Sequence, residues 1–527
     1  MASAIGEIVQ TQPGERRGVE DGRFFTESGA SFCYENLPQA PDGGLIEAGT
    51  PECHGAGRLL CHQKAIDELL VQAIPASTRK LELDGYPGEL GLLKNCRDAE
   101  GHIYGAQENY EAEVATGAGL LVYRAALALV APIILAHALV FWAVTIVLLA
   151  LLVVTVIVLV LAFLVVPRWR NSGALGRLFD EDNPAFIRAL GRVMSPLDRA
   201  LGFSAVTLAG PPLRFFAFRR QRRALTGFLV SRPILTGAGT IDHESRFGLS
   251  EKGPAIRRLV RTATSPENRP LFDTGNLMKD LFAPFRFQIA PFFRLFRARQ
   301  RMQLGFSDSN VAQVAEYLKI GTTALVLDMA EAGLLDDAPR PARPVDALHT
   351  IAADPTLAAH VPMVGGTAMS ALTIQREYLR RAKAFLRAST TPSMEAHQIV
   401  TLWEQTLDSL EADPGRLVGS LDWVSKRYLL ETCAATAPYE VQKKIDLRYH
   451  ELGTGYLARM EKAGIARKIV ADAEIAEAMR TPPQSTPARL RGQLIKSLGA
   501  SALPIRVSWE TIRIGGRLRG KVIRLRD

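Results

Sequence analysis

The feature that most constrains this chain is a long run without a fixed charge, residues 125–167, in which His137 is the only titratable side chain. A helix that crosses a membrane needs about 20 apolar residues. As one straight helix this run would rise about 65 Å, whereas the hydrocarbon core of a bilayer is about 30 Å thick. The length of the run therefore predicts two crossings rather than one.

The two crossings and their connection can be placed on the sequence. We expect a first helix over residues 117–136, with the Arg124 side chain reaching back to the near interface. We expect a second helix over residues 142–166, and a tight turn from His137 to Trp142 at the far interface, where tryptophan is favoured. The alternative is a buried core hairpin of a soluble protein, and the length of the apolar run disfavours it.

Two arginine-rich segments follow the apolar run. The arginines that open residues 168–224, a basic juxtamembrane segment, place that end of the hairpin in the cytoplasm. Residues 284–301 interleave phenylalanine with arginine, which is typical of an interfacial amphipathic segment on anionic lipid. Nucleic-acid binding uses the same residue types, but beside a transmembrane hairpin lipid is the simpler interpretation. For a chain of net charge +9 we therefore predict membrane lipid, and no nucleic acid, as a partner.

The cysteines and the N-terminus also bear on location. The chain has 5 cysteines, and an odd number does not suit a fully disulfide-bonded protein, so a reducing, cytoplasmic setting is favoured. The first residues, MASAIGEIVQTQPGERR, contain no apolar core of signal-peptide length. We expect a membrane protein with two helices whose main domain is cytoplasmic.

The rest of the 527-residue chain reads as a mixture of strands and helices. Short strands and turns dominate the first 115 residues, helices dominate from Asn310 onward, and residues 505–524 alternate like strands. Because strands and helices do not alternate regularly, the pattern predicts an α+β fold rather than a doubly wound one.

Several blocks along the chain carry a more specific signal. They are residues 29–35 (GASFCYE), 46–53 (IEAGTPEC), 94–98 (KNCRD), 104–110 (YGAQENY), 228–239 (FLVSRPILTGAG), 306–310 (FSDSN), 317–328 (YLKIGTTALVLD), 374–378 (IQREY), 422–427 (DWVSKR), 474–478 (EIAEA) and 482–492 (PPQSTPARLRG). In this order they resemble the Pup ligase and depupylase family, the proteasome accessory factors. The last block argues against another ligase of the glutamine-synthetase-like superfamily.

The resemblance implies a glutamine-synthetase-like fold, in which helices pack on a curved antiparallel sheet and a small C-terminal domain follows. We expect five segments: the first part of the ligase-like domain (1–116), the transmembrane hairpin (117–167), the basic segment (168–224), the second part of the domain (225–455) and the C-terminal domain (456–527). The hairpin would be an insertion between strands of one domain. Both of its ends must then lie on one side of the membrane, and the use of ATP makes that side the cytoplasm.

The resemblance also implies an activity. Members of this family use ATP and Mg²⁺ to phosphorylate the C-terminal glutamate of a small ubiquitin-like protein tag, Pup, and a lysine of a protein substrate then attacks the acyl phosphate. Depupylase relatives use the same site for hydrolysis, and the blocks in this sequence do not separate the two reactions. We therefore expect ATP and Mg²⁺ as cofactors, and a Pup-like tag and lysine-bearing proteins as partners.

Site residues follow from the same resemblance, residue by residue. Glu35 occupies the position of the catalytic aspartate, and Glu47 matches a Mg²⁺ ligand. The nucleotide contacts are Thr50, Trp509 as an aromatic contact to ATP, and position 31, which holds Ser31 in this chain.

Three departures from the family pattern support a second hypothesis. Ser31 replaces an arginine that contacts ATP, and Cys33 replaces a metal-binding tyrosine although a neutral thiol is a poor ligand for Mg²⁺. The family's opening strand with its G-I-E-T-E pattern is not visible, and residues 6–8 are at most a faint echo of it. The alternative function is therefore a degenerate pseudoenzyme, a membrane-tethered module that binds a nucleotide or a tag without turnover.

Overall fold

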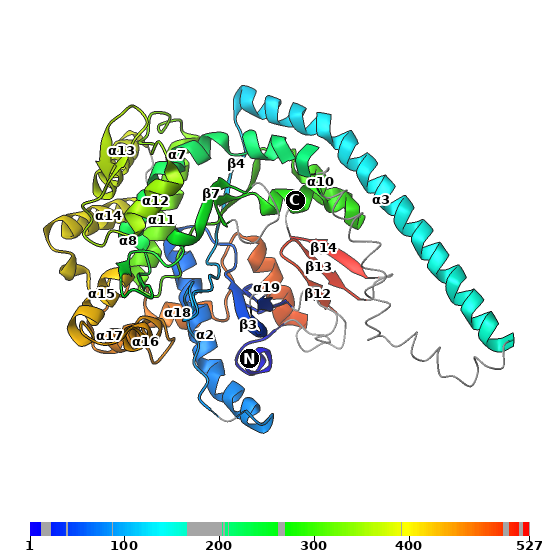
Figure 1. Ribbon diagram of the computed structural model, residues 1–527, viewed down its shortest axis with the longest axis horizontal. Helices are drawn as coiled ribbons and strands as arrows, with labels where there is room; N and C mark the ends of the chain where they lie inside the picture. The colour runs from blue at the N-terminus through cyan, green and yellow to red at the C-terminus, as the bar shows by residue number, and fades with distance from the viewer. Residues whose placement is uncertain are drawn as a thin grey trace. The chain divides into compact units, whose positions relative to one another are not determined.

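The computed structural model describes residues 1–11, 23–37, 40–86, 88–165, 203, 206–208, 210–261, 269–390, 393–498, 505–515 and 520–525 (Figure 1). Contacts within the chain divide it into two compact units. Unit 1 comprises Met1–Ala106, Arg223–Ile256 and Phe306–Asp527, and unit 2 comprises Gln107–Arg222 and Arg257–Gly305. The five segments expected from the sequence stay predictions.

The N-terminal part of unit 1 forms a small antiparallel sheet. Its strands are β1 (Phe24–Phe25), β2 (Ser31–Leu37) and β3 (Ala40–Gly49), in the order β1-β2-β3. The helix α1 (Ala2–Ile8) precedes the sheet and packs on α2 (Ala56–Leu83). Residues 6–8 therefore belong to a helix rather than to the opening strand that the family pattern suggested.

Helices make up most of unit 1. They are α8 (Pro233–Thr236), α11 (Gln313–Glu331), α12 (Pro344–Ala352), α13 (Ala371–Ala388), α14 (Met394–Ala412), α15 (Asp422–Cys433), α16 (Tyr439–Tyr449), α17 (Tyr456–Lys462), α18 (Asp472–Ala478) and α19 (Pro487–Leu498). The central one is α11, which packs against α2, α8, α13 and α14 and is buried along most of its length. The carboxylate of Asp422 accepts hydrogen bonds from the backbone N–H groups of Val311 (3.3 Å) and Ala312 (2.9 Å), so it satisfies donors at the start of α11.

The C-terminal strands join the N-terminal sheet through a common core. The strands β12 (Ile505–Val507), β13 (Thr511–Ile514) and β14 (Lys521–Arg524) form an antiparallel sheet. Phe25 of β1 and Ile495 of α19 belong to the same buried cluster as three residues of this sheet, Ile505, Val507 and Ile512. This packing fixes the loop between β12 and β13 next to β1–β3. Two further pairs of short strands complete unit 1: β5 (Thr240–Ile241) with β6 (Phe247–Gly248), and β10 (His360–Pro362) with β11 (Ala368–Ser370).

Unit 2 is built on a second sheet. Its strands β4 (Glu108–Glu113), β9 (Arg299–Leu304), β8 (Arg269–Asp273) and β7 (Ile256–Val260) lie in the order β4-β9-β8-β7. Around it lie α9 (Gly275–Leu281), η3 (Ala283–Arg286) and α10 (Ile289–Arg294), and α7 (Arg219–Ser231) runs across the boundary between the units. The expected α+β class is therefore present. The described strands form several smaller sheets, and the curved sheet of the glutamine-synthetase type stays a prediction.

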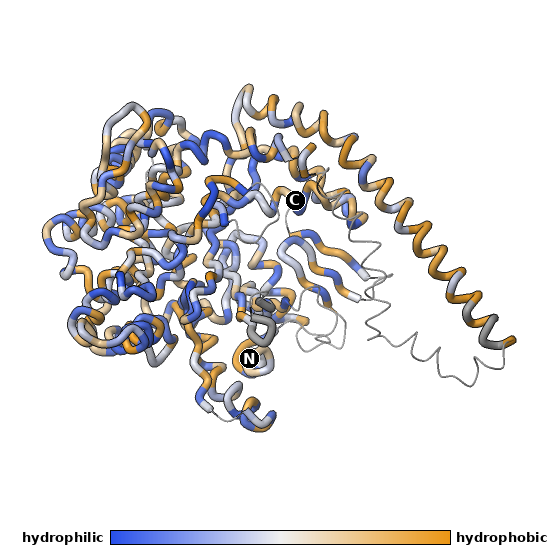
Figure 2. Tube along the Cα trace, in the orientation of Figure 1, coloured by the Kyte–Doolittle hydropathy of each residue, from blue (hydrophilic) through white to orange (hydrophobic). Residues whose placement is uncertain are grey.

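The predicted transmembrane hairpin is not confirmed. One continuous helix, α3 (Gly117–Val165), takes the place of the two predicted helices and continues without a break through the predicted turn (Figure 1). The reason is local, because the stretch from His137 to Trp142 contains no glycine, proline or asparagine that would end a helix. Among the described residues this is the one helix that is long and apolar enough to cross a membrane, and Figure 2 shows its hydrophobic character along most of its length.

The two halves of α3 have different surroundings. A stripe at helical spacing is buried in the first half: Tyr123, Leu127, Val130, Ile134 and Ala138. The Arg124 side chain donates to the Phe296 carbonyl (2.9 Å), and the Trp142 ring stacks on that of Phe287 with centroids 3.5 Å apart. Beyond Trp142 no described side chain of α3 is buried.

The structure does not test the predictions for the arginine-rich segments. Residues 284–301 contribute to η3, α10 and the first residues of β9, and their contact with lipid stays a prediction. Their aromatic side chains pack partly on α3, while Phe287 and Phe293 stay 70% and 61% exposed. The basic segment predicted over residues 168–224 lies largely outside the described residues.

Candidate functional site

The strand register brings most of the predicted site residues onto one face of the N-terminal sheet. Ser31 of β2 pairs with Gly49 of β3, Cys33 with Glu47, and Glu35 with Leu45. Side chains alternate along a strand, and directly opposed residues share a face. Ser31, Cys33, Glu35, Glu47 and Gly49 therefore lie on one face of the sheet, which we call the β2–β3 face.

Trp509 reaches this face from the loop between β12 and β13. A Cβ atom placed on Gly49 would lie 2.8 Å from the Ser31 hydroxyl oxygen and 3.1 Å from Cζ2 of Trp509. Residue 49 therefore has room only for a glycine unless one of these neighbours moves. Thr50 follows Gly49 directly, so it lies at the same end of β3. The structure thus brings together Ser31, Gly49 and Trp509.

Arg491 of α19 holds Trp509 in place, a role that the sequence did not reveal. Its guanidinium is fully buried and lies 5.0 Å from the ring centroid of Phe25 and 4.8 Å from that of Trp509. It donates to the Glu52 carboxylate (2.5 Å), to the Gly29 carbonyl (3.1 Å) and to the Trp509 carbonyl (3.2 Å). Arg491 belongs to the block at residues 482–492, and this contact gives a physical reason for an arginine there.

Arg23 is a second residue that the sequence did not reveal. Its guanidinium donates one hydrogen bond to the Ser31 hydroxyl (3.1 Å) and another to the Glu47 carboxylate (3.2 Å). Arg23 precedes β1, whose two residues pair with Phe32 and Ser31 of β2, so the same register sets Arg23 opposite Cys33. A two-residue strand has too little alternation to be recognised in a sequence.

Cys33 lies between the charged groups and stays a neutral thiol. Its sulfur donates to the Glu47 carboxylate (3.4 Å), and burial, together with the nearby charge of Glu47, raises the pKa of the thiol to about 11. A protonated thiol is a poor ligand for a hard cation such as Mg²⁺. The departure noted in the sequence therefore has a physical consequence at this site.

The β2–β3 face provides only some of the ligands that a bound Mg²⁺ needs. Its oxygen donors are the carboxylates of Glu35, which is exposed, and Glu47, whose side chain is 50% exposed. Mg²⁺ is commonly bound by one or two carboxylates together with phosphate oxygens and water, rather than by a cage of protein ligands. The residues present therefore suit a metal ion that arrives with a phosphate-bearing ligand.

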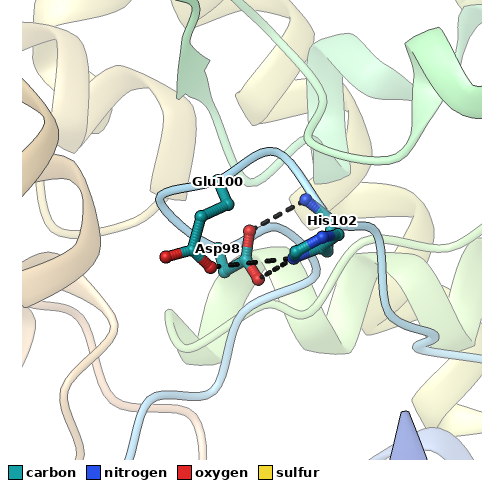
Figure 3. Close-up of side chains that lie close together, drawn as sticks. All are labelled: Asp98, Glu100 and His102. Carbon is teal, nitrogen blue, oxygen red and sulfur yellow. Dashed lines mark hydrogen bonds and ion pairs between the residues drawn. The ribbon is translucent and has the colours of Figure 1, made fainter. Parts of the chain in front are cut away.

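A second group of potential metal ligands lies in the loop at residues 98–104 (Figure 3). Nδ1 of His102 is 2.8 Å from Asp98 and 3.7 Å from Glu100, and the His102 backbone N–H also donates to Asp98 (2.8 Å). The Tyr104 hydroxyl donates to the same carboxylate. Burial alone would raise the pKa of Asp98, but the hydrogen bonds from Tyr104 and His102 lower it. These bonds within the loop account for the geometry without a metal.

A third group of titratable side chains is fully buried in unit 1. The Lys426 ammonium contacts Asp446 (2.5 Å), Glu251 (3.2 Å) and the Gly239 carbonyl (2.7 Å), and Lys443 pairs with Asp446 (2.6 Å). We call Glu251, Lys426, Lys443 and Asp446 the buried ion cluster. Burial raises the pKa of Glu251 to about 7 although Lys426 opposes this shift. The three hydrogens of the Lys426 ammonium all have acceptors, so this cluster supports the fold rather than a ligand.

Comparison with known proteins identifies what this arrangement is similar to. The family model described as "Pup-ligase protein" matches residues 10–513. The Pup--protein ligase of Mycobacterium avium is 32% identical over 322 residues, which cover 58% of this chain and 66% of the relative. That of Mycobacterium ulcerans is 31% identical with the same coverage. The chain thus spans just under two thirds of the length of these relatives.

Solved structures show the same likeness at the level of the fold. The Pup ligase PafA in complex with ADP superposes with a TM-score of 0.65 at 19% identity, covering 96% of this chain and 86% of that one. PafA in its complex with the prokaryotic ubiquitin-like protein Pup gives the same TM-score and identity, covering 95% of this chain and 80% of that one.

Proposed function

The chain belongs to the Pup-ligase family, and from this premise we propose that it is an ATP- and Mg²⁺-dependent ligase that joins a small ubiquitin-like tag to lysine side chains of other proteins. The curated relatives are named Pup--protein ligases, and the solved neighbours include a complex with ADP and a complex with Pup. The observation that carries the proposal is the meeting of Ser31, Glu47 and Trp509 around one face of the N-terminal sheet, from segments far apart in the chain.

Three residues at this face have a part in the proposed reaction. Trp509 offers an aromatic surface to the nucleotide, and Glu47 binds the metal jointly with the phosphates. Bound Mg²⁺ would offset the charge of the transferring phosphoryl group. Glu35, which is exposed on the same face, accepts the proton of the attacking amine. Its side chain is one methylene longer than that of aspartate, which moves the carboxylate by about 1 Å, and misplacement on this scale slows a reaction.

A conjugation assay tests this proposal directly. The purified chain is incubated with labelled Pup, a lysine-bearing protein, ATP and Mg²⁺, and isopeptide conjugates and ADP are measured together. We expect conjugates only when ATP and Mg²⁺ are both present. Preformed conjugates are incubated in parallel, so that cleavage is scored separately. Cleavage without conjugation would contradict the ligase assignment and indicate the hydrolytic reaction.

The alternative is a nucleotide- or tag-binding module without turnover. The neutral thiol of Cys33 and the short side chain of Ser31 favour it, because they leave the β2–β3 face with fewer ligands for metal and phosphate. Binding of Mg²⁺–ATP without release of ADP, in the presence of tag and substrate, would establish this alternative and overturn the ligase.

We also infer that the second half of α3, residues 143–165, contacts lipid. This half would be about 34 Å long, close to the thickness of the hydrocarbon core of about 30 Å. It carries no charge and none of its described side chains is buried, whereas the first half packs on η3.

The sheet of unit 2 limits how α3 can meet a membrane. The chain leaves the sheet after β4, and the Phe218 backbone N–H donates to the Val114 carbonyl (2.7 Å) where it returns. The excursion from residue 115 to 217 therefore begins and ends at one place, and an odd number of crossings is impossible. We propose that both ends of this excursion lie on the cytoplasmic face of the membrane.

Flotation with vesicles tests the lipid contact. The full-length chain is mixed with vesicles of phosphatidylcholine and phosphatidylglycerol and centrifuged through a density gradient. We expect the wild type to float and the variant Val154→Arg to stay at the bottom, because a charge in the free half of α3 opposes insertion. The matched control is Leu129→Arg, on the exposed side of the packed half, which should still float. Equal flotation of all three proteins would overturn the assignment.

A further inference from the structure

Arg23 supplies the positive charge of the β2–β3 face. The strands β1, β2 and β3 themselves contain no lysine or arginine, whereas Glu35 and Glu47 are both carboxylates. A nucleotide brings several negative charges, so a site made only of these strands would repel it. Arg491 also lies close to this region, but it is fully buried and paired with Glu52. It therefore positions Trp509 and does not supply charge to the face.

The position of the Arg23 guanidinium suits phosphate binding. It lies against the Ser31 hydroxyl, at 3.1 Å, and against the Glu47 carboxylate, at 3.2 Å. A serine at residue 31 is short enough to leave this space to a guanidinium that comes from another strand. The planar guanidinium presents several donors at once, a geometry that matches phosphate oxygens.

Arg23 and Glu47 can exchange each other for new partners without a large loss of stability. Their side chains are 24% and 50% exposed, and an exposed pair of this sort contributes little to stability. When a metal ion occupies the Glu47 carboxylate, the guanidinium loses that partner and can donate to a phosphate instead.

We propose that Arg23 is a phosphate-binding residue of this site, and that its contact with Glu47 is replaced by Mg²⁺ and nucleotide phosphate on binding. This inference rests on the proposed function, because it takes the β2–β3 face to be the nucleotide site. Arg23 thereby provides, from the residue before β1, the charge that residue 31 does not provide from β2.

Calorimetric titration of the full-length chain with Mg²⁺–ATP and with adenosine tests the inference. The variant Arg23→Ala should bind Mg²⁺–ATP about tenfold to hundredfold more weakly, because hydrogen bonds between charged groups are lost. Its affinity for adenosine should stay unchanged, since adenosine has no phosphate. Arg23→Lys, which keeps the charge but not the planar donor pair, should bind Mg²⁺–ATP with intermediate affinity.

A second variant tests the position of the charge. Arg23→Ser combined with Ser31→Arg moves the guanidinium to the neighbouring strand, into the space that Arg23 leaves. We expect this double variant to regain most of the affinity for Mg²⁺–ATP that Arg23→Ser alone loses. The matched control is Arg246→Ala, which removes an exposed arginine paired with Asp242 and Glu244 and should leave the affinity unchanged.

The outcomes separate this inference from the proposed function. If the wild type does not bind Mg²⁺–ATP, the proposed function fails and the inference fails with it. If the wild type binds and Arg23→Ala binds equally well, only the role of Arg23 is overturned. Equal losses for Mg²⁺–ATP and adenosine would also overturn it, because they would indicate a general loss of structure.

Discussion

Two groups of ion-paired side chains in unit 1 have similar composition and different surroundings. On the β2–β3 face Arg23 and Glu47 leave 24% and 50% of their side chains exposed. In the buried ion cluster Lys426 and Glu251 each leave 1% exposed. Buried charges must be fully paired, whereas exposed ones can change partners at little cost. The buried ion cluster and the Arg23–Glu47 pair thus differ in burial and in the number of filled donor positions rather than in residue type. The first group supports the fold, and the second can take part in binding.

Removing a charge from the buried ion cluster should have the largest effect. Lys426→Met takes away the partner of Asp446 and Glu251 and should lower the free energy of unfolding by about 3–5 kcal/mol. Urea unfolding followed by circular dichroism measures this change. The matched control is Lys468→Met, in a pair with Asp472 whose side chains are 42% and 78% exposed, and it should change stability by about 0.5 kcal/mol or less. Equal losses would remove the distinction between the two groups.

Removing a charge from the β2–β3 face should affect ligand binding rather than stability. Glu47→Gln keeps the size of the side chain but loses the metal-binding charge, so Mg²⁺–ATP should bind at least about tenfold more weakly. The free energy of unfolding should change by about 1 kcal/mol or less, because the pair with Arg23 is exposed. Calorimetry with and without Mg²⁺ measures the first effect. A loss of stability as large as that of Lys426→Met would make Glu47 a structural residue.

Crowding the face should have an intermediate effect on both properties. Gly49→Val places carbon atoms where the Ser31 hydroxyl and Trp509 lie, and overpacking of this kind costs about 1–3 kcal/mol. Trp509 would shift, so nucleotide affinity should fall as well. Gly210→Ala serves as the control and should change neither property, because an added Cβ meets no atom within 4 Å among the described residues beyond its chain neighbours. Unchanged nucleotide affinity in Gly49→Val would indicate that Trp509 does not contact the nucleotide.

The pH dependence of stability should also report on the buried ion cluster. Burial raises the pKa of Glu251 to about 7 in the folded chain, above its value of about 4.3 in an unfolded chain. Between these values the folded state holds a proton that the unfolded state has released. The stability of the wild type, relative to Glu251→Gln, should therefore fall as pH rises from about 4.5 to 7 and stay level above. A relative stability that rises over this interval would contradict the assigned shift.

The blocks of the sequence predicted the parts of the site that depend on short-range patterns. Ser31, Glu35 and Glu47 each lie within a recognisable segment, and the register of β2 and β3 brings them onto one face of the sheet. Their roles stay predictions. Arg23 was missed because β1 has only two residues and cannot be recognised from alternation. Arg491 was missed because its partners are set by packing between distant segments. The buried ion cluster was missed for the same reason, since Glu251 and Lys426 meet only in the folded chain.

The hairpin predicted from the length of the apolar run was not found. Its composition correctly indicated an exceptional hydrophobic element, and comparison with the thickness of a bilayer predicted that it would fold back on itself. A turn, however, needs residues that end a helix, and the stretch from His137 to Trp142 has none. The packing of Tyr123, Leu127 and Ile134 within unit 2 instead supports one continuous helix.

Photo-crosslinking with an azido derivative of ATP locates the bound nucleotide on the chain and so tests whether the β2–β3 face is the nucleotide site. The full-length protein is irradiated with this probe and Mg²⁺, and the labelled peptides are identified by mass spectrometry. We predict label in the peptides that contain residues 31–50 or Trp509, reduced by excess ATP and by omission of Mg²⁺. Label confined to other segments, such as the loop at residues 98–104, would contradict the assignment of the β2–β3 face as the nucleotide site.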